Sequence, residues 1–278
     1  MKLKKGLRNY LIALLVLVII FCIVKIITVK LEYDAGEQIY GDALDTFVEN
    51  PQGDTVSGNE APPAEEIPDD SQASDAEKEV FPDLGIDFEK LCAVNEDIIG
   101  WIWIPGTRIN YPLLQGEDNS EYLRTAYNLE PSRFGSVFLD YRNAPDFTDT
   151  NTIIYGHNMR NDAMFGTLSY FADLEFAEDH TDMYIFTENA TYHYRIFSAY
   201  TARTYEFPYI INFEFVKSHE EFLQFIFDES VSLKREEPLT LEDHILTLST
   251  CLSTSSYTKR FVIHGVLESS SLDDMDVG

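Results

Sequence analysis

The segment Ile245-Leu246-Thr247-Leu248-Ser249-Thr250-Cys251 is separated by eight residues from Arg260-Phe261-Val262-Ile263. Polar and apolar side chains alternate along the first segment, which is the period of a β-strand. If the second segment folds back antiparallel, Arg260 reaches the side of Cys251, because Cβ atoms of opposed residues lie about 5 Å apart. The sequence therefore predicts a thiol beside a guanidinium on neighbouring strands.

A cation next to a thiol favours the thiolate and can hold a developing oxyanion, so this pair points to nucleophilic chemistry. A thiol nucleophile also needs a proton partner, for which the chain offers six histidines. The strongest candidate is His157, because it follows the buried strand Ile153-Ile154-Tyr155 and a Gly turn that would project the ring from the rim of a sheet. A histidine that merely ends a strand is the alternative.

Working outward, the pattern predicts a mainly β domain with eight short strands. We expect a helix over 88–94, strands over 98–104, 108–114, 135–140, 152–155, 183–186, 191–200, 245–251 and 260–267, and a second helix over 218–227. Ser218 and Glu221 have the spacing of a capping box at the start of that second helix. Eight strands in a domain of this length favour a closed barrel or a sandwich.

Charge divides the chain into three parts. Residues 1–30 carry six Lys or Arg and no acid, residues 31–80 carry one Lys and fifteen acids, and residues 81–278 carry thirteen bases and thirty-three acids. In the first part, basic residues precede an apolar run from Leu11 to Val24 that continues past Lys25. This predicts an uncleaved membrane anchor with its N-terminus inside and the rest of the chain outside; a signal peptide is the alternative.

Residues 31–80 are rich in Asp, Glu, Pro, Gly and Ser, so we expect a flexible acidic linker there. A short helix over 43–48 is the one ordered stretch expected within it. The folded domain is then residues 81–278, with a short acidic C-terminal tail.

Only two cysteines, Cys92 and Cys251, lie outside the expected membrane span. A disulfide between them would make Cys251 structural, whereas the helical pattern around Cys92 favours a buried thiol. No His/Cys spacing of the zinc type and no calcium-loop pattern occurs, so no metal or other cofactor is predicted. The acidic balance gives no reason to expect a nucleic acid as partner.

Further motifs recur in a specific order along residues 88–267. These are Asn95-Glu96-Asp97-Ile98-Ile99-Gly100-Trp101-Ile102, Ile104-Pro105-Gly106-Thr107, Tyr111-Pro112-Leu113-Leu114-Gln115, Asp118-Asn119 with Tyr122-Leu123, Tyr155-Gly156-His157-Asn158-Met159, Met164-Phe165-Gly166, and Thr247-Leu248-Ser249-Thr250-Cys251 with Arg260. In these motifs the chain resembles a class B sortase, a membrane-anchored cysteine transpeptidase of Gram-positive bacteria.

The resemblance implies a closed eight-stranded sortase barrel, with the helix near 218–227 in the connection before the Cys strand. It implies a catalytic trio of His157, Cys251 and Arg260. It also implies that a groove for the sorting peptide is lined by Asn119, Leu123, Tyr155 and Ser249. One departure is Leu252-Ser253, where some members have an acid just after the cysteine.

The reaction that the resemblance implies is acyl transfer from an Asn-Pro-x-Thr-like sorting signal, after its Thr, to an amine of a peptidoglycan precursor or a pilin. Residues 81–278 have a net charge of −20, which opposes thiolate formation, so the chemistry requires Arg260 and a protonated His157 close to the thiol. Two alternatives stay open: a tethered extracellular binding module with an inert or disulfide-bonded Cys251, and a cysteine peptidase.

Overall fold

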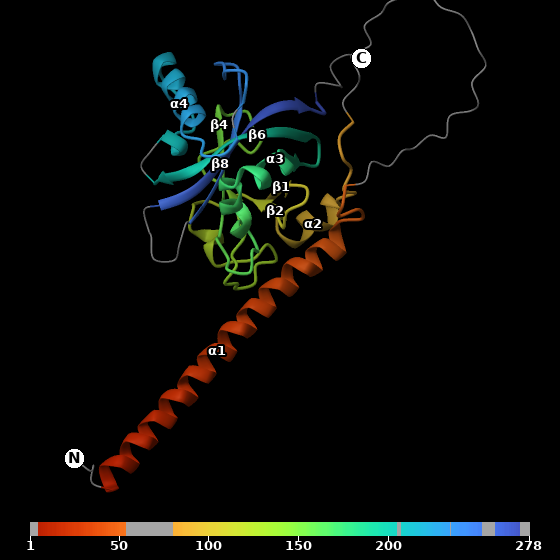
Figure 1. Cartoon of the computed structure of the whole chain (residues 1–278). Coiled ribbons are helices and arrows are strands. Elements are labelled where there is room, and N and C mark those ends of the chain that lie inside the picture. The colour runs from red at the N-terminus through yellow and green to blue at the C-terminus, as the bar shows by residue number, and fades with distance from the viewer. Residues whose placement is uncertain (1–4, 54–79, 205–206, 234, 252–258, 273–278) are drawn as a thin grey trace, which may run out of the picture.

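Eight strands close into a single barrel in the computed structural model of the chain, which describes residues 5–53, 80–204, 207–233, 235–251 and 259–272 (Figure 1). The strand order around the barrel is β1-β2-β3-β4-β7-β8-β6-β5. The strands are β1 (Ile98–Trp103), β2 (Asn110–Leu114), β3 (Val137–Leu139), β4 (Asn151–Gly156), β5 (Asp182–Phe186), β6 (Thr191–Arg203), β7 (Ile245–Cys251) and β8 (Lys259–Ser270). The prediction of a closed, mainly β barrel is confirmed.

Two of the eight strand pairs are parallel, β2 with β3 and β4 with β7, and the others are antiparallel. A parallel pair aligns the carboxyl ends of its strands, so whatever follows β4 lies beside whatever follows β7. The long connection between β6 and β7 contains a helix, α4 (Val216–Asp228). This topology brings two distant parts of the chain to one rim of the barrel.

The helices are α1 (Lys5–Phe47), α2 (Phe88–Val94), α3 (Leu174–Asp179) and α4 (Val216–Asp228), with 3-10 turns η1 (Glu121–Leu123), η2 (Gly166–Ala172) and η3 (Phe207–Tyr209). Helix α2 matches the predicted helix, and α4 contains the predicted 218–227. The prediction of a capping box at Ser218 is wrong, because α4 begins at Val216, two residues before Ser218. The Ser218 hydroxyl donates to the Phe215 carbonyl instead.

Helix α1 runs unbroken from the expected membrane anchor into the expected linker. The prediction of a flexible linker is therefore wrong for residues 31–42 and 49–53. The short helix expected over 43–48 is found as the end of α1, which runs to Phe47, and Val48 then bridges to Ile86 before α2. The rest of the linker, residues 54–79, lies outside the described residues. The ordered body accordingly begins within α1 rather than at residue 81.

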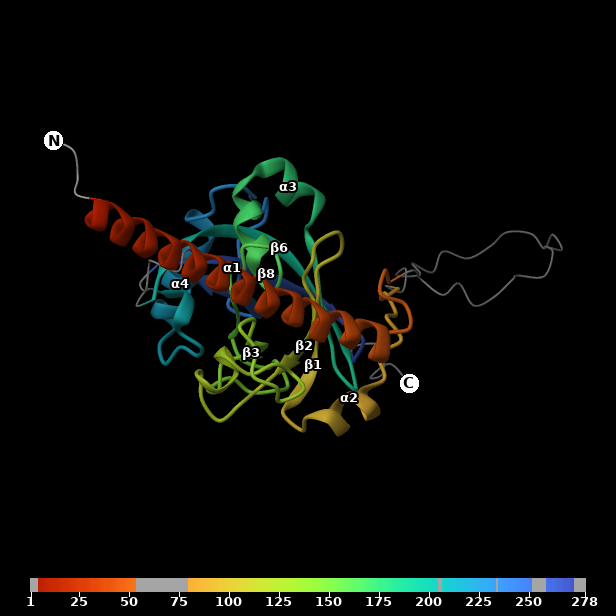
Figure 2. The ribbon, with the colours of Figure 1, turned by 90° about the horizontal axis from the view of Figure 1, so that it is seen from below.

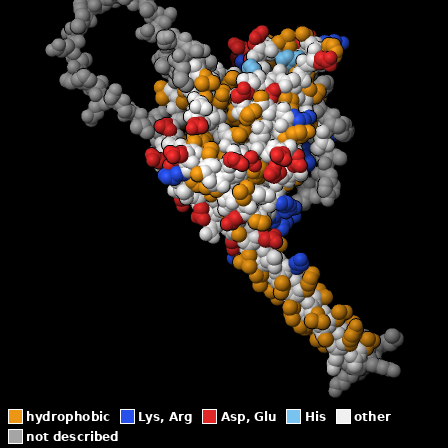
Figure 3. All heavy atoms as spheres, turned by 180° about the vertical axis from the view of Figure 1, so that it is seen from behind, with side chains coloured by type: hydrophobic (Ala, Val, Ile, Leu, Met, Phe, Trp, Pro, Cys, Tyr) orange, Lys and Arg blue, Asp and Glu red, His pale blue; other side chains and the backbone are white. Residues whose placement is uncertain are grey.

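The first half of α1 is covered by exposed large apolar side chains from Leu7 to Leu31, which form an apolar sleeve on the protruding part of the helix (Figure 3). The helix is long enough and apolar enough to cross a membrane. A sleeve of this kind is costly to leave in water, and about 20 residues suffice to span a hydrocarbon core.

The second half of α1 runs along the barrel (Figure 2). It packs against the barrel through Tyr40, Ala43 and Phe47, all of which are buried. These residues recur at helical spacing and so form one face, and the Tyr40 hydroxyl donates to the Gly135 carbonyl. Two surface ion pairs flank this contact, Arg108 with Glu37 at 2.6 Å and Arg133 with Glu32 at 2.9 Å. The acidic residues of this segment thus border an apolar docking face.

Gly36 lies where α1 approaches the barrel most closely, since a Cβ at this position would come within 2.5 Å of the buried Phe134 ring. We expect Gly36→Ala to destabilise the full chain by about 1–3 kcal/mol, because the buried ring must shift to make room for the methyl group. Gly41 lies in the same helix, and a Cβ added there would meet no atom within 4 Å. Gly41→Ala is therefore the matched control, and its higher helix propensity should leave stability unchanged or raise it. Urea unfolding in detergent measures both, and equal effects would contradict close packing at Gly36.

Helix α4 covers the outer face of the barrel, where Phe222, Leu223 and Ile226 pack on side chains of β6, β7 and β8. Beneath it lies a chain of buried hydrogen bonds. The Thr247 hydroxyl donates to Asn151 Oδ1 at 2.6 Å, because the amide nitrogen of Asn151 already donates to the carbonyls of Pro208 and Ile210. Having given its only proton, the Thr247 hydroxyl can only accept from its other neighbour, the ring of His264.

His264 is fully buried, with Nδ1 2.8 Å from the Thr247 hydroxyl and Nε2 3.1 Å from the Tyr200 hydroxyl. Nδ1 therefore carries the proton and donates, and Nε2 accepts from Tyr200. Burial lowers the pKa of His264 to about 3. The neutral ring is thus a structural part of this chain of hydrogen bonds.

Stability should fall in acid through His264. Its pKa is about 3 in the folded chain and about 6.5 when unfolded, so the unfolded chain binds the proton first as the pH drops. The stabilisation is complete above pH about 6.5 and declines by about 1.4 kcal/mol per pH unit towards pH about 3. Urea unfolding at several pH values should give a shallower acid decline for His264→Gln than for the unsubstituted chain. Parallel declines would show that His264 does not cause the effect.

Candidate active site

The ends of β4, β7 and β8 bring the three predicted catalytic residues to one rim of the barrel. In the parallel pair of β4 and β7, Gly156 is opposite Thr250, so His157 and Cys251 are the next residues on adjacent strands. In the antiparallel pair of β7 and β8, Cys251 is opposite Arg260. The backbone of Cys251 is described as the last residue of β7, while its side chain lies outside the described part of the chain. The register therefore places the end of β4, the end of β7 and the start of β8 next to one another.

The alternation along β7 sends its side chains to two different environments. Leu246 and Leu248 point into the main core of the barrel, whereas Ser249 lies on the outer side, where its hydroxyl is 3.0 Å from that of Tyr209. Cys251 follows Ser249 by two residues and so shares its face of the strand.

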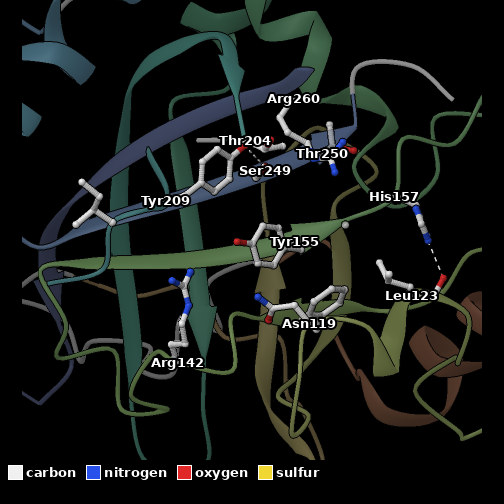
Figure 4. Close-up of a pocket in the computed structure, with 13 residues that line it drawn as sticks. Asn119, Leu123, Arg142, Tyr155, His157, Thr204, Tyr209, Ser249, Thr250 and Arg260 are labelled. Carbon is white, nitrogen blue, oxygen red and sulfur yellow. Dashed lines mark hydrogen bonds between the residues drawn. The ribbon is translucent and has the colours of Figure 1, made fainter. Parts of the chain in front are cut away.

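A pocket of about 530 Å³ opens on this side of the barrel (Figure 4). Its lining includes all four residues expected to bind the sorting peptide and two of the expected trio. The described lining residues are Asn119, Leu123, Phe138, Arg142, Tyr155, Gly156, His157, Thr204, Tyr209, Ile210, Ser249, Thr250 and Arg260. The thirteen come from the η1 segment, the barrel strands and their ends, the turn between β3 and β4 that carries Arg142, and the connection between β6 and α4.

His157 is half-buried, and its Nε2 lies 2.7 Å from the Leu123 carbonyl oxygen. A carbonyl can only accept, so Nε2 carries a proton and Nδ1 is the nitrogen left to exchange one. Burial lowers the pKa of His157, the bond to Leu123 partly offsets this, and the charges of Arg124 and Arg260 lower it further. The lowered pKa favours the neutral ring at neutral pH, so the protonated His157 that the chemistry requires is the minority form.

Arg260 supplies an uncommitted donor to the pocket. Its Nη1 is buried and has no hydrogen-bond partner among the described residues, and the same holds for the Thr250 hydroxyl. Leaving a buried donor unpaired costs about 1–3 kcal/mol, so such groups are kept where a ligand can pair with them. Both lie on the side of the pocket where β7 ends and β8 begins (Figure 4).

A buried carboxylate, Asp140, organises the other end of the pocket. Its Oδ2 accepts from the Asn119 amide at 3.0 Å and from the Tyr155 hydroxyl at 2.9 Å. Arg142 donates from Nε to Oδ1 and from Nη2 to Oδ2. Burial acts to raise the pKa of Asp140, but these hydrogen bonds, led by those from Arg142, bring it below its usual range. Asp140 is ionised at neutral pH and fixes three pocket-lining side chains.

Sequence reasoning missed several residues of this pocket. The sequence contained one feature that could have pointed to Arg142. This is Asp140, a carboxylate two residues earlier at the end of a buried strand. The wall formed by Thr204, Tyr209 and Ile210 had none, because it lies in an irregular connection without periodicity. Its position depends on the contacts of Asn151 with that segment, which are distant in sequence.

Cys92 is a free thiol in α2, with its Sγ 3.6 Å from the Ile98 carbonyl. It is therefore not disulfide-bonded to Cys251. Burial is the main cause that raises the pKa of Cys92, which disfavours its thiolate. Within the described residues, no group of three His, Cys, Asp or Glu side chains could hold a metal ion.

The sortase domain family matches residues 102–268 of the chain. With this match, the barrel order and the strand ends described above, the chain belongs to the sortase family, whose members are cysteine transpeptidases. Its relatives are class B sortases. It is 40% identical to Sortase B of Listeria monocytogenes over 183 residues, which cover 65% of this chain and 72% of the relative.

Two solved structures show the same likeness in three dimensions. A Staphylococcus aureus sortase B–substrate complex is 36% identical with a TM-score of 0.61, over 65% of this chain and 83% of that one. Sortase B from B. anthracis is 30% identical with a TM-score of 0.66, over 85% of this chain and 98% of that one.

Proposed function

We propose that this transpeptidase cleaves an Asn-Pro-x-Thr-like sorting signal after its Thr and transfers the acyl group to an amine acceptor of the cell wall. The observation that carries the proposal is the register of β4, β7 and β8, which brings His157, Cys251 and Arg260 to one rim beside the pocket. The similar S. aureus structure is described as a sortase B–substrate complex, which supports substrate binding by the matching barrel.

In the proposed reaction the Cys251 thiolate attacks the threonine carbonyl carbon. The oxyanion that forms is stabilised by the buried Nη1 of Arg260. When the C–N bond breaks, His157 gives a proton to the leaving amine, and the acyl group remains on sulfur as a thioester. An incoming amine then attacks the thioester, His157 takes its proton, and the new C–N bond forms as the C–S bond breaks.

We propose that the four expected groove residues bind the signal on the acyl side. Tyr155 and Ser249 form the floor, where they are opposed in the pairing of β4 and β7. Asn119 and Leu123 form the side wall contributed by the η1 segment. All four lie in one pocket, which supports a single peptide as the ligand.

The sleeve of α1 supports the proposal of a single-pass anchor. Because Lys and Arg precede the apolar run, the N-terminus would lie inside and the barrel outside, where cell-wall acceptors are found. This location would also supply the protein's substrates, which are surface proteins.

Incubation of the full chain in detergent with an Asn-Pro-x-Thr peptide and a short amine tests the function. The proposal predicts cleavage after Thr and a ligated product, both lost in Cys251→Ala, whereas a cysteine peptidase would give only the hydrolysed acid. A thiol-selective methanethiosulfonate should modify Cys251 faster than Cys92, whose pKa is raised by burial. Equal rates would argue for an inert Cys251.

A further inference from the structure

A rigidly held arginine lies at the end of the pocket away from the proposed reaction centre. Arg142 binds Asp140 through Nε at 2.9 Å and through Nη2 at 2.8 Å. The Asp140 side chain is 0% exposed, while that of Arg142 is 46% exposed. A buried anchor and a solvent-facing guanidinium give a donor whose position is fixed before any ligand arrives.

The anchor itself is saturated. Asp140 also accepts from the Arg142 backbone N–H, from Asn119 and from Tyr155, so the two latter pocket side chains direct their donors to it. The Asn119 amide oxygen is likewise used, because it accepts from the Tyr141 N–H. Among the described side chains that contact Asp140, Asn119 therefore keeps one amide N–H, and Arg142 keeps the larger set of uncommitted donors.

A guanidinium has five N–H donors, and the two side-chain bonds to Asp140 use two of them. Within the described residues, no acceptor is bound to Nη1. Figure 4 shows the Arg142 guanidinium directed toward the Tyr155 hydroxyl, on the side where the pocket lies. Arg142 can thus give hydrogen bonds to a bound peptide without moving.

The proposed chemistry says which part of the peptide reaches Arg142. The leaving amine must lie beside His157, since that ring protonates it. Tyr155 precedes His157 by two residues, about 7 Å along an extended strand, and its hydroxyl leads to Asp140 and Arg142. The Arg142 end of the pocket is therefore on the acyl side, occupied by residues N-terminal to the scissile bond.

We propose that Arg142, positioned by Asp140, is a specificity-determining residue that donates hydrogen bonds to the side-chain amide oxygen of the asparagine in the sorting signal. This inference rests on the proposed function. It identifies the residue that recognises the first side chain of the signal. It also explains why that side chain is uncharged.

The pairing of Arg142 with Asp140 explains why the ligand should be uncharged. The carboxylate neutralises the guanidinium, so the pair acts as a donor with no net charge. An amide oxygen suits such a donor, whereas an aspartate in the peptide would add an uncompensated negative charge next to Asp140. Removing the charge of Asp140 while leaving Arg142 in place should shift the preference toward a carboxylate.

The test compares kcat and KM for three peptides that carry Asn, Ala or Asp at the first position, using the full chain in detergent. In Arg142→Gln, KM for the Asn peptide should rise about 10- to 100-fold with kcat changed by less than about threefold, and the discrimination between Asn and Ala should disappear. Asp140→Asn should raise the ratio of kcat/KM for the Asp peptide over the Asn peptide about tenfold.

Matched controls come from a second carboxylate–arginine pair outside the pocket. Asp182 lies 3.0 Å from Arg195, whose side-chain exposure of 41% is close to the 46% of Arg142, while Asp182 is 35% exposed and Asp140 is buried. Arg195→Gln and Asp182→Asn should leave the peptide ratios unchanged. Melting temperatures of all four variants identify any that fails to fold, and Arg142→Gln keeps the test valid if Asp140→Asn unfolds.

An unchanged ratio of Asn to Ala in folded Arg142→Gln would overturn the proposal, as would an equal loss for all three peptides. Absence of cleavage of every peptide by the unsubstituted chain would instead contradict the proposed function. The two failures are therefore distinguishable.

Discussion

Arg260→Ala is expected to lower kcat/KM for the sorting peptide by about 10²–10³-fold while the melting temperature changes little. The buried Nη1 of Arg260 has no described partner, so its role is reserved for a group that the substrate brings. The pairing of Arg260 with Cys251 depends on backbone hydrogen bonds of β7 and β8, which the substitution leaves in place. Loss of a buried unpaired donor should not destabilise the fold.

Peptide cleavage and thermal melting of the same preparation check this prediction. Arg260→Lys is the informative companion variant, because it keeps the charge but loses the planar fork and should recover only part of the activity. A parallel fall of activity and melting temperature would instead identify Arg260 as a structural residue.

His157→Gln is expected to reduce kcat by about 10²–10⁴-fold. Glutamine can still donate to the Leu123 carbonyl, so the loop keeps its contact, but it cannot carry a proton between the thiol, the leaving amine and the acceptor. The expected loss is therefore chemical rather than structural. Retention of most of the activity with normal melting would contradict a role in proton transfer.

The pH dependence of kcat/KM gives a second measure of the same residue. The reactive form needs a proton on His157 and none on Cys251. Burial lowers the pKa of His157, so the acid limb of the profile should lie below pH about 6.5. On the plateau at pH values above this limb, only a minority of molecules carry both a protonated His157 and a deprotonated Cys251. His157→Gln should abolish this limb, and an acid limb above pH about 6.5 would be inconsistent with a buried ring.

The strand pattern was readable from the sequence because each strand of the barrel carries a strong period of two or a short apolar run. The pairing of Cys251 with Arg260 followed from two adjacent strands and a short connection, and it is found in the register of β7 and β8. The pairing of β4 with β7 was not readable, since a parallel contact between strands about 90 residues apart leaves no local signal.

The second half of α1 was misread because its composition resembles a disordered segment. The residues that dock it, Tyr33, Tyr40, Ala43 and Phe47, recur at helical spacing among many acids. The high content of acidic residues predicts disorder. The helix forms because one of its faces is apolar and packs on the barrel surface. Arg142 was missed for a related reason, because its role depends on a buried carboxylate whose environment only the fold creates.

The unbroken course of α1 changes how the enzyme would meet its substrates. A flexible tether would let a catalytic domain sample a volume above the membrane, whereas a continuous helix that is packed on the barrel and anchored as proposed would hold the reaction centre at one height. The search for a partner would then be lateral diffusion in two dimensions. Both the cleavage site and the acceptor amine would have to lie at that height, so the length of α1 would set the distance from the membrane at which the reaction occurs.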